Sequence, residues 1–271
     1  MPEIEPRDQS LKSLKGLHLW HAGMSSCSQR VRIALAEAGR EFESHLINLE
    51  RGEHATEEYQ SIHPNGVVPA LVEDGHLYIE SVDIIRHISK GNDDLSKSVD
   101  ADLLKRADAA QKDLKLLTFE FLFRGGPAKD SEEVKSFHEN HKNQWLKQFH
   151  ADFAKGFERD RIAAAVNRTK AEFDHLNDVL SDGRSFLSGK DFSLADIAWI
   201  PNVHRFELMR WPFEDTAHLQ RWFERISKRS SYAKALVAWE NPRARNTLKA
   251  YTEKRRQEGT DIRSFGDLRK S

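Results

Sequence analysis

Strand-like and helix-like segments alternate in a fixed order over the first third of the chain. Leu17 and Leu19 lie on one face of the first strand-like segment and Trp20 on the other, and the helix-like segments repeat apolar residues at helical spacing. Asp74-Gly75 separates two strand-like halves and is a strong signal for a two-residue hairpin turn. The order is therefore β-α-β and then β-β-α, which predicts a small α/β domain. The strand-like segments are residues 16–23, 41–49 and the two halves of 67–80, and the helix-like segments are 28–40 and 81–91.

The pattern changes once, near Ala101, where strand signals almost vanish and long amphipathic stretches begin. Ser193 and Asp196 in "DFSLADIAWIP" have the spacing of a capping box, which predicts a helix over the apolar residues that follow. With 271 residues the chain is long enough for two domains. We expect an N-terminal extension over 1–15, the α/β domain over 16–92, a linker over 93–103, an all-helical domain over 104–240 and a basic tail over 241–271.

Composition excludes several classes of protein. Charged residues make up 31% of the chain and the net charge is -1, so there is no electrostatic reason to expect a nucleic-acid partner. No apolar run is long enough to cross a membrane, and the polar N-terminus does not resemble a secretory signal. The single cysteine, Cys27, excludes an internal disulfide. We expect a protein of the cytoplasm.

Five short motifs carry a resemblance to a known family. "SSCSQRVRIAL" resembles the active-site segment of the serine-type cytosolic glutathione transferases and is most similar to the zeta-class pattern. The other four motifs occur in family order: "GEH", "HPNGVVPAL", "ES" and "FLSGKDFSLADI". The resemblance spans roughly residues 16–240 and implies a thioredoxin-like N-terminal domain followed by an all-helical C-terminal domain, with glutathione as co-substrate.

Within that resemblance, Ser25 is the residue expected to donate a hydrogen bond to the glutathione sulfur. Lowering a thiol pKa from about 8.5 by roughly two units requires about 2.7 kcal/mol of thiolate stabilisation. A hydrogen bond to a charged acceptor supplies about 1.5–3 kcal/mol and a helix N-terminus about 0.3–1 kcal/mol. Ser25 therefore needs no general base. We expect Ser26 to be a capping hydroxyl and Arg30 a packing or ion-pairing residue, with assistance to the thiolate as its alternative role.

The resemblance also implies which residues hold the tripeptide. Val68-Pro69 corresponds to the family's cis-proline, where the Val68 backbone would pair with the cysteinyl unit as an added strand would. Glu80 and Ser81 precede a helix whose N-terminus suits the γ-glutamyl carboxylate, while Glu80 would face its ammonium. His54 corresponds to a residue that contacts the glycyl carboxylate, and a surface histidine is the alternative interpretation.

Cys27 has two interpretations. In the functional one, its thiol forms a mixed disulfide with glutathione, as the resemblance to zeta-like reductive dehalogenases implies. In the structural one, Cys27 is a small apolar filler at a helix start. Ser25 and Ser28 occupy the positions where a glutaredoxin-like motif would have two cysteines, so disulfide exchange of that kind is not expected.

The helical domain should determine the second substrate. Phe119, Phe121 and Phe123 form an aromatic cluster that would either wall a pocket for an aromatic electrophile or belong to the core. His138 and His141 lie three residues apart, but no third patterned ligand accompanies them. We therefore expect no metal and a solvated, charge-rich helix in that region.

Three reactions fit such a site. The leading hypothesis is thiolate attack on an aromatic compound, in particular cleavage of a β-aryl ether as in lignin breakdown. The alternatives are zeta-like isomerisation or reductive dehalogenation through Cys27, and a non-catalytic glutathione-binding or partner subunit. The resemblance further implies a homodimer, or a heterodimer with a related transferase.

Overall fold

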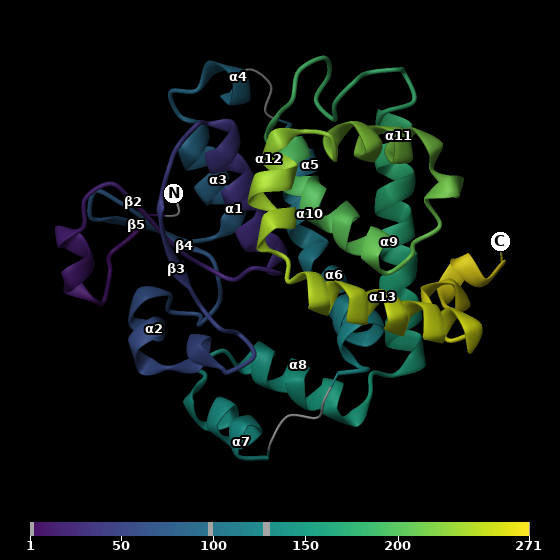
Figure 1. Ribbon diagram of the computed structural model, residues 1–271, viewed down its shortest axis with the longest axis horizontal. Coiled ribbons are helices and arrows are strands. Elements are labelled where there is room, and N and C mark those ends of the chain that lie inside the picture. The colour runs from purple at the N-terminus through teal and green to yellow at the C-terminus, as the bar shows by residue number, and fades with distance from the viewer. Residues whose placement is uncertain (1–2, 97–99, 127–130, 271) are drawn as a thin grey trace. The chain divides into compact units, whose positions relative to one another are not determined.

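The computed structural model describes residues 3–96, 100–126 and 131–270 of the chain (Figure 1). The chain forms two compact units. The first combines the residues up to Lys90 with the later segment 127–155, and the second consists of 91–126 and 156–271. The expected helical domain, 104–240, is thus interrupted by a segment that belongs to the first unit. Residues 97–99 of the expected linker lie outside the described residues.

The first unit contains a five-stranded sheet in the order β1-β5-β4-β2-β3. Strand β2 pairs in parallel with β3 and antiparallel with β4, and β4 pairs antiparallel with β5. The β-α-β and β-β-α order is confirmed, with one strand in addition from the N-terminal extension. The strands are β1 (Glu3–Ile4), β2 (Leu17–His21), β3 (Glu43–Leu46), β4 (Ala70–Glu73) and β5 (His76–Tyr78), and the helices are α1 (Ser26–Glu37), α2 (Glu57–Ile62) and α3 (Ser81–Ser89).

Both faces of this sheet are covered. Helices α1 and α3 pack against each other and bury apolar side chains such as Val31, Leu35 and Ile85 completely. A separate apolar cluster contains Trp20 together with Tyr59 of α2. The N-terminal extension contributes Leu11 to this cluster from the 3-10 turn η1 (Gln9–Ser13), so the extension is part of the folded unit.

The hairpin between β4 and β5 has the expected turn. Asp74 and Gly75 both have positive φ, 49° and 87°, as a two-residue turn of this kind requires. A Cβ atom on residue 75 would lie 2.5 Å from the Lys12 carbonyl oxygen of the extension. Glycine is therefore required here for its backbone conformation and also for the close approach of another segment.

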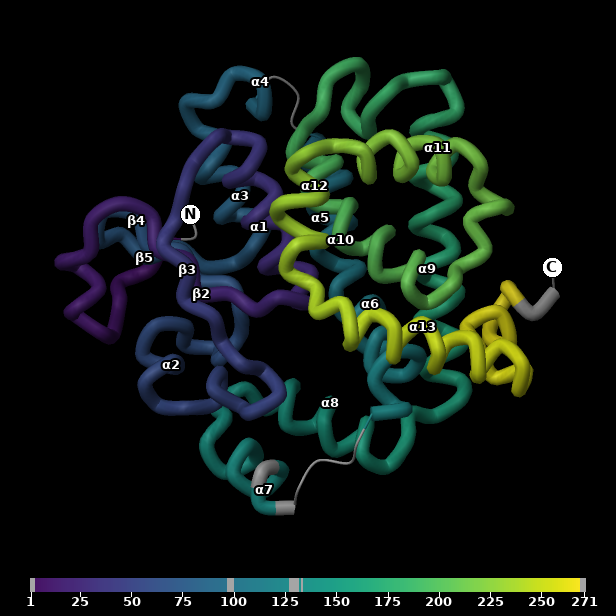
Figure 2. Tube along the Cα trace, in the orientation of Figure 1, coloured from purple at the N-terminus to yellow at the C-terminus, as the bar shows by residue number. Residues whose placement is uncertain are grey.

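The segment inserted after the helical turn at 119–123 packs onto the first unit. It forms α7 (Ser131–Asn140) and α8 (Gln144–Lys155), which lie beside α2 in Figures 1 and 2. Phe137 and Leu146 are buried in a cluster with Ala55. The Gln60 amide of α2 donates to the Asn140 carbonyl and accepts from the Lys142 N–H, both at 3.0 Å.

The expectation of a solvated helix around His138 and His141 is wrong for His141. Its side chain is fully buried, and Nε2 lies 3.0 Å from the Gly66 carbonyl oxygen. The charged residues of "HENHKNQW" indicated a solvated face, yet one histidine of the segment is used to attach it to the sheet-containing unit.

In the second unit, the described residues form helices and no strand. The core is centred on α10, whose Ile197 and Trp199 are almost fully buried, and the Trp199 indole donates to the Leu103 carbonyl at 3.0 Å. The helices are α4 (Asp93–Ser96), α5 (Ala101–Ala109), α6 (Gln111–Thr118), α9 (Arg159–Val179), α10 (Leu194–Leu208), α11 (Ala217–Ile226), α12 (Ser230–Ala235) and α13 (Pro242–Gln257).

The expected capping box starts α10. The Asp196 carboxylate accepts from the Ser193 N–H at 2.8 Å, from the Leu187 N–H at 2.9 Å and from the Trp222 indole at 2.7 Å. Burial raises the pKa of Asp196, although these hydrogen bonds act in the opposite direction. One carboxylate thus joins the start of α10, the preceding loop and α11.

The basic C-terminal segment is a helix followed by 3-10 turns. The Arg255 guanidinium on α13 donates to the Glu120 carboxylate at 3.0 Å and to the Glu120 carbonyl at 2.7 Å. Phe265 packs edge to face on Phe121. These contacts attach the segment to the turn that follows α6.

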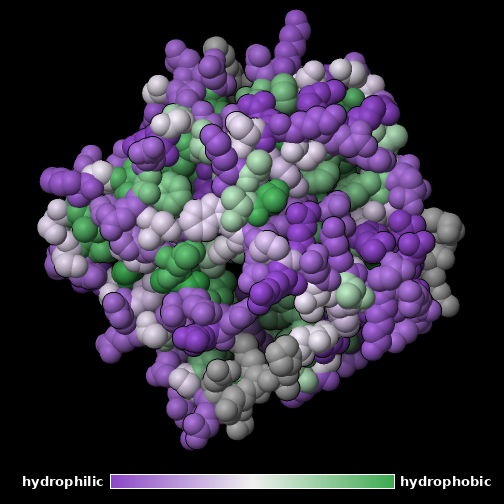
Figure 3. Space-filling view, in the orientation of Figure 1, coloured by the Kyte–Doolittle hydropathy of each residue, from purple (hydrophilic) through white to green (hydrophobic). Residues whose placement is uncertain are grey.

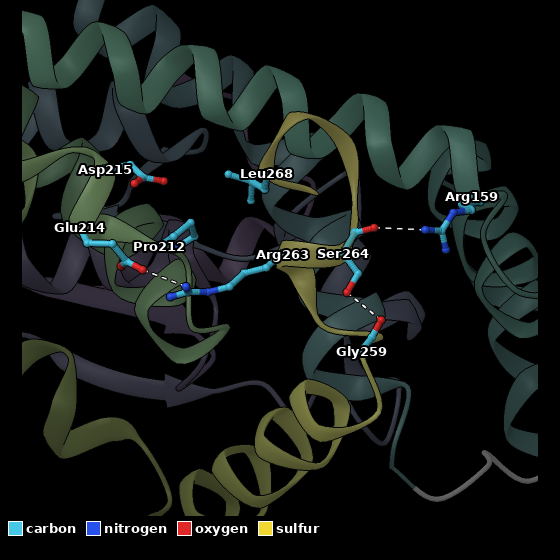
Figure 4. A pocket seen from close by; sticks show the side chains of 8 residues that line it. All are labelled: Arg159, Pro212, Glu214, Asp215, Gly259, Arg263, Ser264 and Leu268. Atoms are coloured by element: carbon cyan, nitrogen blue, oxygen red, sulfur yellow. Dashed lines mark hydrogen bonds and ion pairs between the residues drawn. The ribbon is translucent and has the colours of Figure 1, made fainter. Parts of the chain in front are cut away.

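A polar cavity of about 510 Å³ lies between this C-terminal segment, the start of α9 and the turn η4 (Phe213–Asp215). Figure 4 shows that its arginines are occupied: Arg263 pairs with Glu214 at 2.8 Å, and Arg159 donates to the Ser264 carbonyl at 3.1 Å. The cavity therefore offers no uncommitted cation to a ligand.

Hydrophilic residues occupy most of the face drawn in Figure 3. Among the residues that the structure describes, the exposed large apolar side chains are Leu46, Val134 and Trp145. None of the described helices combines the length and the apolarity that crossing a bilayer would demand.

Candidate glutathione site

The strand register brings the expected site residues of the first unit to one edge of the sheet. Ala70 opposes Trp20, near the end of β2, so Pro69 and the segment after β2 lie at the same edge. Tyr78, at the end of β5, opposes Leu71 of β4. Because β3 runs parallel to β2, the segment that leads from it to His54 also begins there. The segments that enter or leave the sheet at this edge contain Ser25, Val68-Pro69, Glu80-Ser81 and His54.

Ser25 is the N-cap of α1, and its side chain is half-buried. Its Oγ accepts a hydrogen bond from the Ser28 N–H at 3.2 Å. Since a hydroxyl that accepts can still donate its proton, the Ser25 O–H can point toward a ligand at the helix start. Ser26 is the first residue of the helix, so the expectation that it provides the capping hydroxyl is wrong; Ser25 does so.

A buried arginine holds the turn that carries Ser25. Arg32 donates to the carbonyls of Ala22 and Gly23 at 3.1 and 2.8 Å, and its Nη1 lies 3.0 Å from Nδ1 of His21. Burial lowers the pKa of Arg32 to about 9, so the guanidinium stays charged at neutral pH. Burial, followed by the charge of Arg32, lowers the pKa of His21 to about 3, so the imidazole is neutral and accepts from Arg32. Sequence reasoning missed both residues, although two arginines in "RVR" were visible.

Arg30 connects the two helix starts of the site. Its guanidinium is fully buried and donates to Ser81 Oγ at 3.2 Å. Glu80 is exposed and has φ 64° and ψ 111°, a backbone conformation that residues other than glycine rarely adopt. Glu80 is the N-cap of α3, and Ser81 is the first residue of that helix. Such strained positions cluster at ligand sites, where surrounding contacts hold them.

The Val68-Pro69 peptide bond is cis, as the family resemblance implied. The Tyr59 hydroxyl donates to the preceding carbonyl, that of Val67, at 2.7 Å, and burial raises the pKa of Tyr59 so that it remains a donor. Among the described residues, the Val68 backbone takes part in no hydrogen bond of the sheet. Its N–H and C=O are therefore available to an extended ligand.

His54 does not lie on the surface. It is 7% exposed and contacts the rings of Phe137 and His141 of the inserted segment, with centroids 5.5 and 5.4 Å apart. Cys27, the second residue of α1, is half-buried and forms no disulfide. The structure thus rules out the surface-histidine interpretation of His54, and its contact with the glycyl carboxylate stays a prediction, as do both interpretations of Cys27.

The three phenylalanines of the expected substrate pocket lie in the second unit, on one π-helical turn, η3 (Phe119–Phe123). Phe121 is 2% exposed and packs on Phe265 and Arg255, so it belongs to the core. Phe119 and Phe123 are half-buried, and their rings meet edge to face at 5.3 Å. Only these two retain surface for a ligand.

Comparisons with known proteins agree with this architecture. The family models "Glutathione S-transferase, N-terminal domain" and "Glutathione S-transferase, C-terminal domain" match residues 24–90 and 159–225. Glutathione S-transferase TCHQD of Arabidopsis thaliana is 23% identical over 83% of this chain and 91% of its own length. Maleylacetoacetate isomerase of Mus musculus is 26% identical over 73% of this chain and 82% of its own.

Among solved structures, β-etherase LigF from Sphingobium sp. strain SYK-6 superposes with a TM-score of 0.70 at 20% identity. The superposition covers 81% of this chain and 98% of LigF. The glutathione transferase BmGSTD1 of Bombyx mori gives a TM-score of 0.58 at 20% identity, covering 88% of this chain and 99% of its own. At these identities the superpositions show a shared fold.

Proposed function

This chain belongs to the cytosolic glutathione transferase superfamily, and on that premise we propose that it is an enzyme in which Ser25 stabilises the glutathione thiolate for attack on an aromatic electrophile. The observation that carries the proposal is the common sheet edge. An N-capping hydroxyl, the Val68 backbone, which takes part in no hydrogen bond of the sheet, and the start of α3 all lie at this edge.

In this proposal glutathione binds in an extended conformation at the edge of the sheet where β2 ends and β4 begins. The backbone of Val68 pairs with its cysteinyl unit, which places the sulfur near the start of α1. Ser25 donates its O–H to the thiolate while the Ser28 N–H occupies a lone pair of the same oxygen, an arrangement that strengthens the hydroxyl as a donor. The γ-glutamyl carboxylate binds at the start of α3, and Glu80 faces the ammonium.

The leading reaction is cleavage of a β-aryl ether. The thiolate attacks the ether carbon and a C–S bond forms. The C–O bond breaks, and the phenolate leaves with the electron pair and takes a proton from water. The likeness to LigF, which is described as a β-etherase, supports this choice. Phe119 and Phe123 are the remaining candidates for contact with an aromatic ring.

Isomerisation is the second candidate, because a maleylacetoacetate isomerase is among the relatives. Reductive dehalogenation through Cys27 is the third and requires a reactive thiol at that position. A non-catalytic glutathione-binding or partner subunit is the alternative from outside the enzymes. A dimer of identical or related chains and a cytoplasmic location stay predictions.

The test is glutathione-dependent turnover of a β-aryl ether, a halogenated hydroquinone and maleylacetone by wild type, Ser25→Ala and Cys27→Ala. We expect ether cleavage to fall at least about 10-fold in Ser25→Ala, the loss of one thiolate hydrogen bond worth about 1.4 kcal/mol. Cys27→Ala should keep wild-type ether cleavage. The thiolate absorbance of bound glutathione should weaken in Ser25→Ala alone.

Ser26→Ala is the matched control, since it removes a neighbouring hydroxyl that does not cap the helix. Loss of dehalogenation only in Cys27→Ala would transfer the function to the redox-thiol reaction. Glutathione binding without turnover of any substrate would favour the non-catalytic subunit.

A further inference from the structure

A cluster of metal-ligand side chains lies on the first unit. His18 of β2 pairs with Glu43 of β3, and Trp20 pairs with His45 in the same register. Because side chains two residues apart share a face of a sheet, all four project from one side. His18 is the second residue of β2, whereas Ser25 follows the end of that strand, so none of the three ligand side chains is one of the expected glutathione contacts.

The donor atoms of His18, Glu43 and His45 all lie within 4.8 Å of one another. His18 Nδ1 is 3.1 Å from His45 Nε2 and 3.5 Å from a Glu43 carboxylate oxygen, and the second Glu43 oxygen is 3.9 Å from His45 Nε2. Nitrogen and oxygen ligands about 2.0–2.2 Å from a tetrahedral Zn²⁺ are roughly 3.3–3.6 Å apart. The observed separations span this range without a rearrangement of the backbone.

The surroundings hold both imidazoles in the orientation that a metal needs. His18 Nε2 lies 3.0 Å from the Lys15 carbonyl, and a carbonyl only accepts, so the proton is on Nε2 and the Nδ1 lone pair faces the cluster. Histidine ligands of metals usually donate their other ring N–H in this way. The His45 ring stacks on Trp20 with centroids 4.3 Å apart, which fixes its plane.

From this juxtaposition we propose that His18, Glu43 and His45 bind a divalent transition metal ion, with Zn²⁺ as the ion that the donor set fits. Two neutral imidazoles and one carboxylate supply three ligands, and a water molecule completes the tetrahedron. The site is open to solvent at Glu43, whose side chain is 66% exposed, while His18 is 9% exposed and provides the rigid side. The ion would connect edge strand β3 to β2.

The test is Zn²⁺ titration of the full-length, chelator-treated protein by calorimetry, repeated with Co²⁺ to record the visible absorption of a tetrahedral site. We expect one equivalent of tight binding in wild type. His45→Gln and Glu43→Gln should each weaken it by at least about 10-fold. Both side chains are partly exposed, so these variants should fold, and unchanged glutathione binding would verify this.

His76→Gln is the matched control, because His76 is an exposed histidine on β5 of the same sheet that also contacts a glutamate, Glu3. It should bind Zn²⁺ like wild type. Equal Zn²⁺ affinity of wild type and His45→Gln would assign the binding to others of the 13 histidines and overturn the proposal. Absence of binding by wild type would overturn it as well and leave a hydrogen-bonded histidine pair.

Discussion

At the scale of single residues, the site depends on groups that never reach a ligand. Ser25 provides the hydroxyl, but the position of the turn before it is determined by Arg32, which binds two of its carbonyls. Arg32 in turn needs a neutral His21 as an acceptor, and His21 donates from Nε2 to Ser44 Oγ at 2.8 Å. Protonation of the His21 imidazole would place it, as a cation, next to the Arg32 guanidinium in a buried space, where the two charges repel.

Stability should therefore fall in mild acid. The pKa of His21 is about 3 in the folded chain and about 6.5 when unfolded, so the unfolded state binds more protons between these values. The stabilising contribution of the neutral His21 imidazole is fully present above about pH 6.5 and is lost as the pH falls toward 3. Between pH 7 and pH 5 the free energy of unfolding should drop by about 2 kcal/mol through this group.

Urea unfolding at both pH values measures the effect in wild type and in His21→Gln. The variant should lose about 2 kcal/mol less than wild type over the same interval, whatever its stability at pH 7. His76→Gln, which removes an exposed histidine, serves as the control and should show the wild-type loss. An identical pH dependence of wild type and His21→Gln would contradict the prediction.

At the scale of elements, α10 shows how a short polar motif determines where a buried helix begins. The helix contains Pro201 and is buried on nearly all sides, so amphipathic periodicity does not locate its start. The Asp196 carboxylate does so by accepting from the N-cap, and it also holds the Trp222 indole of α11.

Asp196→Ala should lower the free energy of unfolding by about 3 kcal/mol or more. The loss combines the cap with buried N–H donors left without an acceptor. Asn241→Ala removes the exposed N-cap of α13, which accepts from Arg243 and Ala244, and should cost only about 1 kcal/mol. Chemical denaturation of both variants measures the difference. Equal losses would mean that the Asp196 carboxylate acts as a cap and nothing more.

At the scale of the whole molecule, the inserted helices complete a unit that precedes them by tens of residues. They contact Gly66, two residues before Val68, through the His141 side chain. A Cβ atom there would lie 2.7 Å from the His54 carbonyl oxygen and 2.8 Å from His141 Nε2. The loop before Val68 and the inserted helices thus meet at Gly66, where the space and the backbone conformation require glycine.

Gly66→Ala and Gly39→Ala form a matched pair, because both glycines have positive φ, 56° and 64°, but a Cβ atom on residue 39 meets nothing within 4 Å. Both variants should lose roughly 1–2 kcal/mol from backbone strain. Gly66→Ala should lose about 1–3 kcal/mol more from overpacking and should also bind glutathione more weakly. Equal stabilities in thermal unfolding would contradict the close approach of the insertion.

The sequence was sufficient for the features that depend on local pattern. The strand and helix order, the Asp74-Gly75 turn and the capping box at Ser193 were predicted correctly, whereas the cis bond was implied by the family resemblance. It was insufficient where distant segments meet. His141 could not be distinguished from a solvated histidine, and Phe121 could not be assigned to the core without the C-terminal residues that cover it. The role of Arg32 depends on carbonyls, which have no sequence signature.

The discontinuous first unit has a consequence for biosynthesis. All five strands have been translated by residue 78, but the cluster of Ala55, Phe137 and Leu146 cannot close until α8 has left the ribosome. By then the first helices of the second unit have also emerged. The nascent N-terminal part therefore carries Ala55 and Val67 uncovered during synthesis, and a fragment ending at Lys90 would leave these two side chains uncovered permanently.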